Sequence, residues 1–380
     1  MINMLSAQDS LWMAKALRLA ERGLYTTSPN PRVGCVLVHD DKCVGEGWHQ
    51  YAGEPHAEVH ALRAAGEAAH GATAYITLEP CSHQGKTPPC ADALISAGVT
   101  RVVAAMQDPN PQVAGQGFAK LRAAGIEVEC GLMDVAARDL NIGFFSRMTR
   151  GLPWLRSKIA MSLDGRTALN NGISKWITGA AARQDVQHWR KRSCAILTGI
   201  GTVLADDPQL NVRESQPAIH EQKGSPPETR ALRQPLQAVL DSRLQLPLAA
   251  RILCGGNVVV YAATSDARKI SALEKNGVRV VVLPDTHGRV DLIAVLRDLA
   301  ACGCNEVLVE AGGTLNGALL QAGLVDELVL YLAPQLLGDM ARGMAKLGEL
   351  TMLNQHIKLE WRDMRHVGND LRIVARIKHA

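Results

Sequence analysis

Three residues far apart in the sequence constrain this chain most: His56, Cys81 and Cys90. Imidazole and thiolate are ligands of zinc in proteins, and a catalytic zinc keeps its fourth position for water. Glu58 follows His56 by two residues, and Cys81 follows a proline. A His-x-Glu pair combined with a Pro-Cys pair and a further Cys is typical of zinc-dependent deaminases, in which the Glu moves protons and is not a ligand. The pattern predicts one zinc ion per chain.

The residues around His56 predict a helix. Pro55 suits a first helical position, and the run 56–69 is rich in Ala, Leu and Glu. Residues two apart on a helix point about 200° around its axis, so His56 and Glu58 are not expected to ligate the same ion. This geometry favours His56 on the metal and Glu58 on the water.

The two cysteines are expected at strand and helix ends. Residues 72–78 predict a strand that delivers Cys81, and Cys90 opens the helical run 90–95. A cysteine near a helix N-terminus loses its proton more easily, which favours the thiolate that zinc needs. Eight residues separate the two cysteines, a departure from the Pro-Cys-x-x-Cys spacing of the general deaminase pattern.

Two other interpretations compete with this one. The zinc site is structural if a fourth protein ligand closes it, and His83 is the candidate for that ligand. Alternatively, the chain is a zinc-dependent nucleoside or base deaminase with an unrelated accessory domain. The chain has only 4% aromatic residues and no basic run, which counts against nucleic acid as a partner.

Length and charge suggest two domains with different ligands. A chain of 380 residues is long enough for two separate cores. Residues 1–150 carry 13 Lys and Arg against 15 Asp and Glu, whereas the remainder carries 28 against 22. A modest positive excess in the second part suits phosphorylated small molecules. Nine cysteines without framework spacing and the lack of a signal-like or membrane-spanning apolar run lead us to expect a cytoplasmic protein without membrane contact.

The first domain, residues 1–147, is expected to be a three-layer α/β domain because short β-rich runs alternate with helices. The expected elements are helices 7–22 and 117–124 and strands 35–38, 72–78, 99–106 and 126–130. The Pro- and Gly-rich loop 28–34 contains Asn30, which can hydrogen-bond a base-like ring, although an isolated Asn is more often a simple turn residue. The pattern lapses at 141–151, where we expect a short linker.

The second domain, residues 148–380, is expected to contain one large sheet. Its expected strands are 154–162, 195–199, 237–241, 257–262, 278–283, 306–310 and 328–332, followed by a hairpin of 359–365 and 371–377. Its expected helices are 181–192 and 291–301, and residues 214–234 are expected to form a surface insertion. Two strands run into glycine turns, at 199–208 and at 310–320, where backbone N–H groups can receive a phosphate.

Six motifs together closely resemble the bifunctional riboflavin-biosynthesis deaminase–reductase family of bacteria. They are residues 56–58, 79–90, 108–111, 158–166, 202–208 and 310–313, in the order of that family and across essentially the whole chain. The resemblance implies an α/β architecture with a cytidine-deaminase-like first domain and a second domain similar to dihydrofolate reductase. It also implies Zn²⁺ and NADPH as cofactors and phosphoribosylaminopyrimidines as substrates.

The resemblance also assigns residues to roles. It places zinc on His56, Cys81 and Cys90, with Glu58 as the proton shuttle. The NADPH contacts that it implies are Ala160, Trp176, Thr202, Asp206, Ser242, Gly312, Gly313, Thr314, Leu315, Asn316, Gly317 and Ala318. The substrate contacts are Ser174, Arg190, Leu210, Arg213 and Glu310, with Lys158 nearby. Among these residues, Arg190 and Arg213 are suited to bind a substrate phosphate. We expect a homo-oligomer, a dimer or a tetramer.

Overall fold

The computed structural model describes residues 5–82, 88–111, 113–213 and 232–378. The chain divides into two compact units, Met1–Leu152 and Pro153–Ala380. The prediction of a linker at 141–151 is wrong, because residues Ile142–Arg150 form helix α6. This helix buries Phe144 and is followed by Gly151, which has a left-handed conformation. The division between the units therefore falls after this helix, a few residues beyond the expected boundary at 147.

The first unit is a five-stranded sheet in the order β2-β1-β3-β4-β5. Strand β1 is antiparallel to β2 and β3, whereas β3, β4 and β5 are mutually parallel. The strands are β1 (Gly34–His39), β2 (Lys42–Trp48), β3 (Thr73–Ile76), β4 (Arg101–Ala104) and β5 (Glu127–Cys130). The helices are α1 (Ala7–Glu21), α2 (Ala57–Ala65), η1 (Gly66–Ala69), α3 (Cys90–Ser96), α4 (Gln116–Ala123), α5 (Asp134–Leu140) and α6 (Ile142–Arg150).

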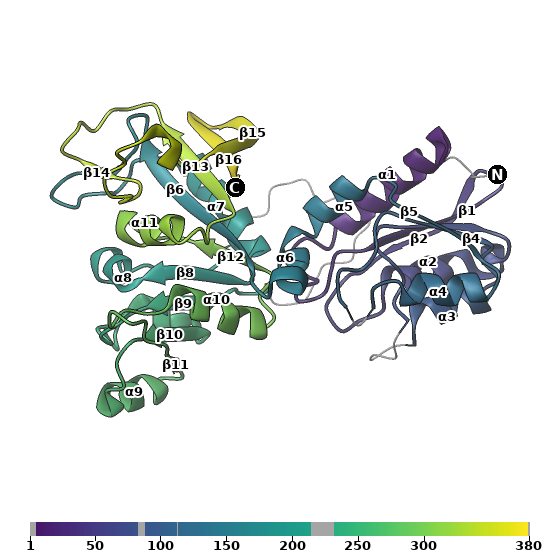
Figure 1. Cartoon of the computed structure of the whole chain (residues 1–380), viewed down its shortest axis with the longest axis horizontal. Coiled ribbons are helices and arrows are strands. Elements are labelled where there is room, and N and C mark those ends of the chain that lie inside the picture. Colours follow the sequence, from purple (N-terminus) through teal and green to yellow (C-terminus); the bar gives the residue numbers. More distant parts are fainter. Residues whose placement is uncertain (1–4, 83–87, 112, 214–231, 379–380) are drawn as a thin grey trace. The chain divides into compact units, whose positions relative to one another are not determined.

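Helices cover both faces of this sheet. Figure 1 shows α1 and α5 on one face and α2, α3 and α4 on the other, so the predicted three layers are confirmed. The apolar sides of these helices and of β1, β3 and β4 form one buried core that includes Met13, Leu37, Ile76 and Leu94. Burial of such side chains is the main favourable term in folding.

Two local predictions in this unit need correction. Strand β2 was not predicted; it pairs with β1 through a hairpin at Asp40 and Asp41, both with positive φ. Short polar residues tolerate this conformation in two-residue hairpin turns. Pro55 is not a helical residue, because His56 is the extended N-cap of α2 and the helix begins at Ala57.

The second unit contains a nine-stranded sheet in the order β11-β10-β9-β8-β12-β6-β13-β16-β15. Its strands are β6 (Trp154–Ser162), β8 (Ala195–Gly199), β9 (Leu236–Leu240), β10 (Val258–Ala262), β11 (Arg279–Val282), β12 (Glu306–Val309), β13 (Glu327–Ala333), β15 (Leu359–Val367) and β16 (Asp370–Ile377). In the spatial order given above, all strands from β11 across the sheet to β13 are parallel to their neighbours. Strands β15 and β16 form the predicted closing hairpin, in which β16 is antiparallel to β13. A separate pair, β7 (Arg166–Ala168) and β14 (Arg342–Gly343), was not predicted.

Helices lie between the strands of this unit along the chain. They are α7 (Ala180–Arg192), α8 (Ile200–Asp206), η2 (Arg251–Gly255), α9 (Ala267–Glu274), α10 (Leu292–Ala301), α11 (Gly313–Gln321) and η3 (Leu353–Gln355). Ala182 and Val186 of α7 pack against Val329 and Tyr331 of β13. Most of the predicted insertion at 214–234 lies outside the described residues. Among the described helices, none is both long enough and apolar enough to span a membrane.

Candidate active sites

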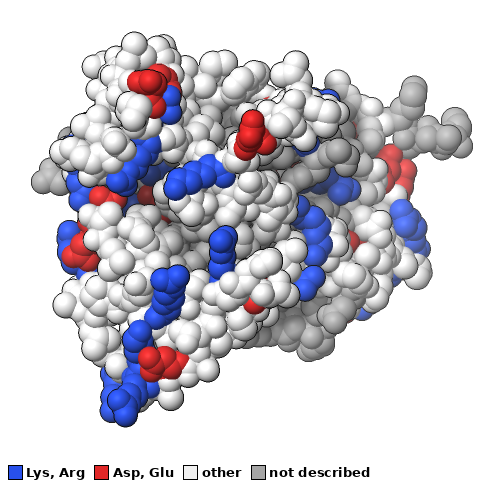
Figure 2. All heavy atoms as spheres, turned by 60° about the vertical axis from the view of Figure 1, so that its left-hand side comes forward, with Lys and Arg blue, Asp and Glu red and all other residues white. Residues whose placement is uncertain are grey.

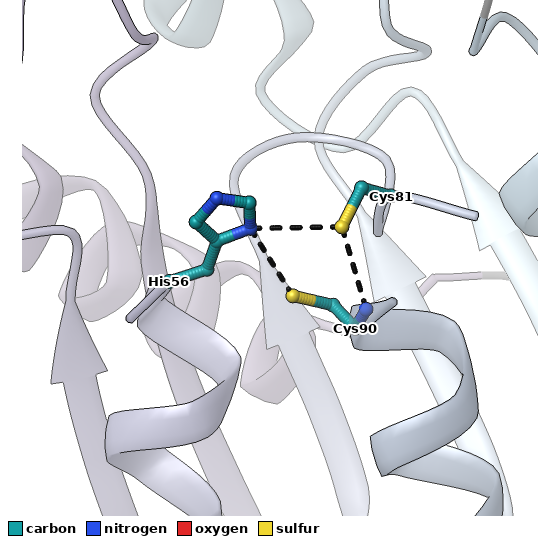
Figure 3. A group of neighbouring side chains, drawn as sticks. All are labelled: His56, Cys81 and Cys90. Carbon is teal, nitrogen blue, oxygen red and sulfur yellow. Dashed lines mark hydrogen bonds between the residues drawn. The ribbon is translucent and has the colours of Figure 1, made fainter. Parts of the chain in front are cut away.

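The three predicted zinc ligands converge in the first unit. Figure 3 shows His56 at the start of α2, Cys81 in the segment that follows β3, and Cys90 as the first residue of α3. The Nδ1 atom of His56 lies 3.6 Å from the Cys81 sulfur and 3.3 Å from the Cys90 sulfur. His56 is 25 positions from Cys81 and 34 from Cys90 along the chain, so the fold brings their donor atoms together.

The donor atoms fit a zinc ion. With Zn–N of about 2.0 Å and Zn–S of about 2.3 Å, tetrahedral geometry places the nitrogen and each sulfur roughly 3.5 Å apart. The three donor atoms all lie within 4.8 Å of one another. Three protein ligands leave one tetrahedral position for water, as in a catalytic site. His83, the candidate fourth ligand of a structural site, lies outside the described residues.

The surroundings of Cys81 favour a thiolate. Hydrogen bonds from the Cys90 thiol, and further from His56, lower the pKa of Cys81 below its ordinary value. The Cys90 backbone N–H also donates to the Cys81 sulfur at 3.3 Å. This N–H belongs to the first turn of α3, where amide groups have no helical acceptor. The helix start therefore stabilises the negative charge that a zinc ligand must carry.

Glu58 lies beside this triad, in the first turn of α2. Its side chain is 3% exposed, and its Oε2 atom accepts no hydrogen bond from the described residues. Burial raises the pKa of this carboxyl above its ordinary value. A carboxyl whose pKa moves toward neutrality exchanges protons more effectively at neutral pH.

Asn30 and His49 form a polar pair near the triad. The Asn30 Nδ2 atom lies 3.1 Å from His49 Nε2, and His49 Nδ1 lies 3.1 Å from the Pro55 carbonyl oxygen. Since a carbonyl only accepts, Nδ1 carries the proton and Nε2 accepts from Asn30. The rings of His49 and His56 meet edge to face with 5.3 Å between centroids. His49 was missed in the sequence, because it follows the unpredicted strand β2.

The second unit has a large cleft of about 2110 Å³. Sites for single drug-sized ligands are roughly 300–1,000 Å³, so this cleft has room for a dinucleotide and a second small molecule. Of the predicted cofactor and substrate residues, those that line it are Lys158, Ala160, Ser174, Trp176, Arg190, Thr202, Asp206, Leu210, Arg213, Ser242, Glu310, Gly312, Gly313, Thr314, Leu315 and Ala318. Lys and Arg outnumber Asp and Glu on the face drawn in Figure 2, which favours anionic ligands.

A buried carboxylate with two cations lies in this cleft. Glu310, directly after β12, accepts from Arg190 Nε at 2.6 Å and Arg190 Nη2 at 3.0 Å. Its Oε2 atom is 3.2 Å from Lys158 Nζ. Burial opposes ionisation of Glu310, but Arg190 and Lys158 outweigh burial and lower its pKa to about 2. The Arg190 Nη1 atom donates to the Asn211 carbonyl at 3.0 Å. Arg190 thus holds the Glu310 carboxylate and the Asn211 backbone in fixed positions.

The glycine turn after β12 has two different parts. Gly312 is the N-cap of α11, and a Cβ atom there would meet no atom within 4 Å. At Gly313, however, a Cβ would lie 2.7 Å from the Gly343 carbonyl oxygen, and at Gly317 it would lie 2.2 Å from that of Lys346. Both glycines therefore let segment 343–346 pack against α11.

Asn316 also helps to hold segment 343–346 against α11. Its side chain is fully buried, accepts from Ser157 at 3.0 Å, and donates to the Ala311 and Met344 carbonyls at 3.1 and 3.2 Å. The predicted cofactor contacts of Asn316 and Gly317 are therefore better explained as packing of α11, whose buried side contains both residues.

Ser174, Trp176 and Asp206 are three more of the predicted contacts that line the cleft. Ser174 lies with its Oγ atom 3.5 Å from Asp206 Oδ1, and Lys175 Nζ donates to the Asp206 carbonyl at 3.3 Å. The Trp176 ring is exposed, with the Arg183 guanidinium 4.4 Å from its centroid. An exposed aromatic ring at a cleft mouth is available to stack on a planar ligand.

The two units have the features of a zinc-dependent deaminase and of a nucleotide-dependent reductase in one polypeptide. Residues 6–106 match the zinc-binding region of cytidine and deoxycytidylate deaminases, and residues 153–373 match the RibD C-terminal domain. The chain belongs to the RibD family of riboflavin biosynthesis proteins. The prediction of a riboflavin-biosynthesis deaminase–reductase is confirmed.

Curated relatives match along nearly the whole chain. The riboflavin biosynthesis protein RibD of Escherichia coli is 53% identical over 96% of this chain and 98% of its own length. The protein of the same name from Haemophilus influenzae is 46% identical over 97% of both chains. The deaminase with an unrelated accessory domain is thereby excluded, because the second unit also belongs to this family.

Solved structures of similar proteins have the same fold along nearly the whole chain. Acinetobacter baumannii RibD superposes with a TM-score of 0.88 at 47% identity, covering 98% of this chain and 99% of that one. A Thermotoga maritima protein described as a diaminohydroxyphosphoribosylaminopyrimidine deaminase/5-amino-6-(5-phosphoribosylamino)uracil reductase has a TM-score of 0.83 at 31% identity, with 98% and 99% coverage. The chain is a bifunctional enzyme, a cytidine-deaminase-like domain followed by a dihydrofolate-reductase-like domain, and its cofactors are Zn²⁺ and NADPH.

Proposed function

We propose that residues 1–152 deaminate 2,5-diamino-6-(5-phosphoribosylamino)pyrimidin-4-one and that residues 153–380 reduce the ribosyl group of the uracil product to ribityl. The observation that carries the proposal is the convergence of His56, Cys81 and Cys90 beside the buried Glu58. The substrates are those in the description of the Thermotoga maritima relative. The cleft of the second unit, which has room for two ligands, supports the reduction.

In the deaminase site we propose His56, Cys81 and Cys90 as zinc ligands. When bound, zinc supplies a water whose pKa is lowered to about 7. Glu58 takes a proton from the attacking water and delivers protons to the departing ammonia, a role that its buried carboxyl supports. Asn30 and His49 form a hydrogen-bonding wall for the pyrimidine ring, which the pairing of their side chains supports.

In the reductase site the chain binds and orients its two ligands. When bound, NADPH supplies the hydride for C1 of the opened ribose. We propose the backbone N–H groups at the start of α11, next to Gly312, for the cofactor phosphates, because a helix N-terminus favours anions. Lys158 and Glu310 position the ribosyl group. Arg213, which lines the same cleft, is the better candidate for the substrate phosphate, because Arg190 is already bound to Glu310.

Assembly and location complete the proposal. We propose a homo-oligomer, a dimer or a tetramer, supported by the exposed apolar side chains Leu359, Trp361 and Met364 on one strand, β15. Sedimentation equilibrium tests this proposal, and a monomer at micromolar concentration would contradict it. We also propose a cytoplasmic location, supported by nine free cysteines.

One assay tests the two reactions together. Purified enzyme is given the diaminopyrimidine ribotide, and ammonia release and NADPH oxidation are followed in parallel. We expect ammonia release without NADPH, and NADPH oxidation only after ammonia has been released. NADPH oxidation with no ammonia, or ammonia release that continues after complete zinc removal, would contradict the assignment of the two sites.

A further inference from the structure

Glu79 is a buried carboxylate with an unusual set of donors. It is 3% exposed and precedes Cys81 by two residues. Four backbone N–H groups donate to it. They are those of Asp108 at 3.2 Å and Gly115 at 2.9 Å, both to Oε2, and those of Gly117 at 2.9 Å and Phe118 at 3.2 Å, both to Oε1. Hydrogen bonds to a charged acceptor are stronger than neutral ones, so this set is a strong anchor.

All four donors come from one segment, the loop 108–115 and the first turn of α4. The positive φ of Gly115 turns the chain into this helix, and the first N–H groups of a helix have no internal acceptor. The Glu79 carboxylate thus caps α4 from outside the helix. A Cβ atom on Gly117 would lie 2.0 Å from the Pro80 carbonyl oxygen, so the segment 79–81 lies directly against α4.

This anchor matters because Cys81 belongs to no regular element. Strand β3 ends at Ile76, five residues before it. The Cys81 carbonyl accepts from the Ala91 N–H at 3.1 Å, and its sulfur accepts from the Cys90 N–H at 3.3 Å, so one side of the segment is held by the start of α3. On its other side, Glu79 holds it to α4. The position of the Cys81 sulfur is therefore set between two helix starts.

We propose that Glu79 is a positioning residue of the zinc site, acting through the Pro80–Cys81 backbone. The inference rests on the proposed zinc ligands. Loss of its charge leaves N–H groups of the 108–118 segment without a carboxylate acceptor, and the segment 79–81 moves away from α4. The Cys81 sulfur then leaves its place opposite His56 and Cys90. Groups that orient metal ligands in this way change metal affinity about 10–100-fold when substituted.

The test compares Glu79→Gln with a matched buried carboxylate, Asp9→Asn. Asp9 is 4% exposed in the same unit and accepts from Ser6, Tyr75 and Arg101, none of which is a proposed zinc ligand or part of the segment 79–81. Zinc affinity is measured by competition with a chelator, and the Co²⁺-substituted proteins are compared by their thiolate-to-metal absorption. We expect Glu79→Gln to raise the zinc Kd about 10–100-fold and to shift the Co²⁺ spectrum, with reductase activity unchanged.

Asp9→Asn is expected to lower the melting temperature while leaving zinc Kd and the Co²⁺ spectrum unchanged. Equal zinc Kd and identical spectra in Glu79→Gln and the parent protein would overturn the inference. So would an equal loss of zinc affinity in Asp9→Asn, because the effect would then be general destabilisation. If Glu79→Gln fails to fold, Glu79→Asp takes its place, since it keeps the charge and shortens the reach. Failure of the zinc assignment itself is distinguishable, because Cys81→Ser would then bind zinc like the parent protein.

Discussion

Glu310→Gln removes one charge from the centre of the reductase cleft and keeps the shape of the side chain. In the structure the carboxylate is bound by Arg190 in a bidentate pair and by Lys158. Its pKa of about 2, against an ordinary value of 4.5, corresponds to about 3 kcal/mol of stabilisation of the folded state. Breaking a buried ion pair by removing one partner costs about 3–5 kcal/mol, which agrees. We therefore expect the variant to lose about 3 kcal/mol at pH 7.

The pH dependence has a definite sign. The pKa of Glu310 is lower in the folded than in the unfolded chain, so its contribution is fully present above pH 4.5 and is lost as the pH falls through 4.5 toward 2. The difference in unfolding free energy between the parent protein and Glu310→Gln should shrink over this range. It should be constant between pH 6 and 8.

Urea denaturation of the full chain, with hydrogen exchange followed in β12, measures this difference for the second unit. Glu360→Gln is the matched control, because Glu360 forms an exposed pair with Arg362 at 3.2 Å. Such surface pairs contribute about 0–1 kcal/mol. Reductase activity should fall sharply in Glu310→Gln, with ammonia release unchanged. A variant as stable as the parent protein at pH 7, or a difference that grows below pH 4.5, would refute the reasoning.

Three further predictions concern the two sites. Glu58→Gln should keep stoichiometric zinc and lose ammonia release by about 10²–10⁴-fold, because the amide cannot transfer protons; metal analysis beside the ammonia assay checks this, and zinc loss would contradict it. Cys81→Ser and Cys90→Ser should lose zinc and deamination while still reducing the deaminated intermediate, and equal loss of both activities in folded protein would contradict separate sites. Gly312→Val should raise the NADPH Kd without changing the melting temperature, because its Cβ meets no protein atom, whereas Gly313→Val should also lower the melting temperature, because its Cβ meets the Gly343 carbonyl. Fluorescence titration and thermal melts separate the two variants, and unchanged NADPH affinity in Gly312→Val would place the cofactor phosphates elsewhere.

The sequence was informative where chemistry and local structure coincide. His56, Glu58, Cys81 and Cys90 were found because zinc chemistry restricts both residue type and spacing, and because His56, Glu58 and Cys90 lie at predictable helix starts. The parallel strands of the second unit were predicted for a related reason, since they are buried on both faces and therefore form short continuous apolar runs.

The sequence was less informative where a residue acts through contacts with distant segments. His49 has no motif, and its place beside His56 follows from the β1–β2 hairpin, which depends on two left-handed Asp residues. Gly313 and Gly317 look like parts of a phosphate-binding turn, but their packing against 343–346 is visible only in three dimensions. A linker was predicted in place of helix α6 because Arg147 and Arg150 in its last turn are followed by Gly151 and Pro153.

Both active sites place a negatively charged group against a helix start. In the first unit, Cys81 lies in the segment that follows β3, and the first N–H of α3 donates to its sulfur. In the second unit, β12 leads directly to Glu310 and then to Gly312, the N-cap of α11. Unpaired N–H groups at a helix start stabilise negative charge, whether a thiolate or a phosphate. The chemistry then depends on what lies opposite the helix start: His56 and a buried carboxyl at Glu58 in one unit, and a wide cleft with Lys158 and Arg213 in the other.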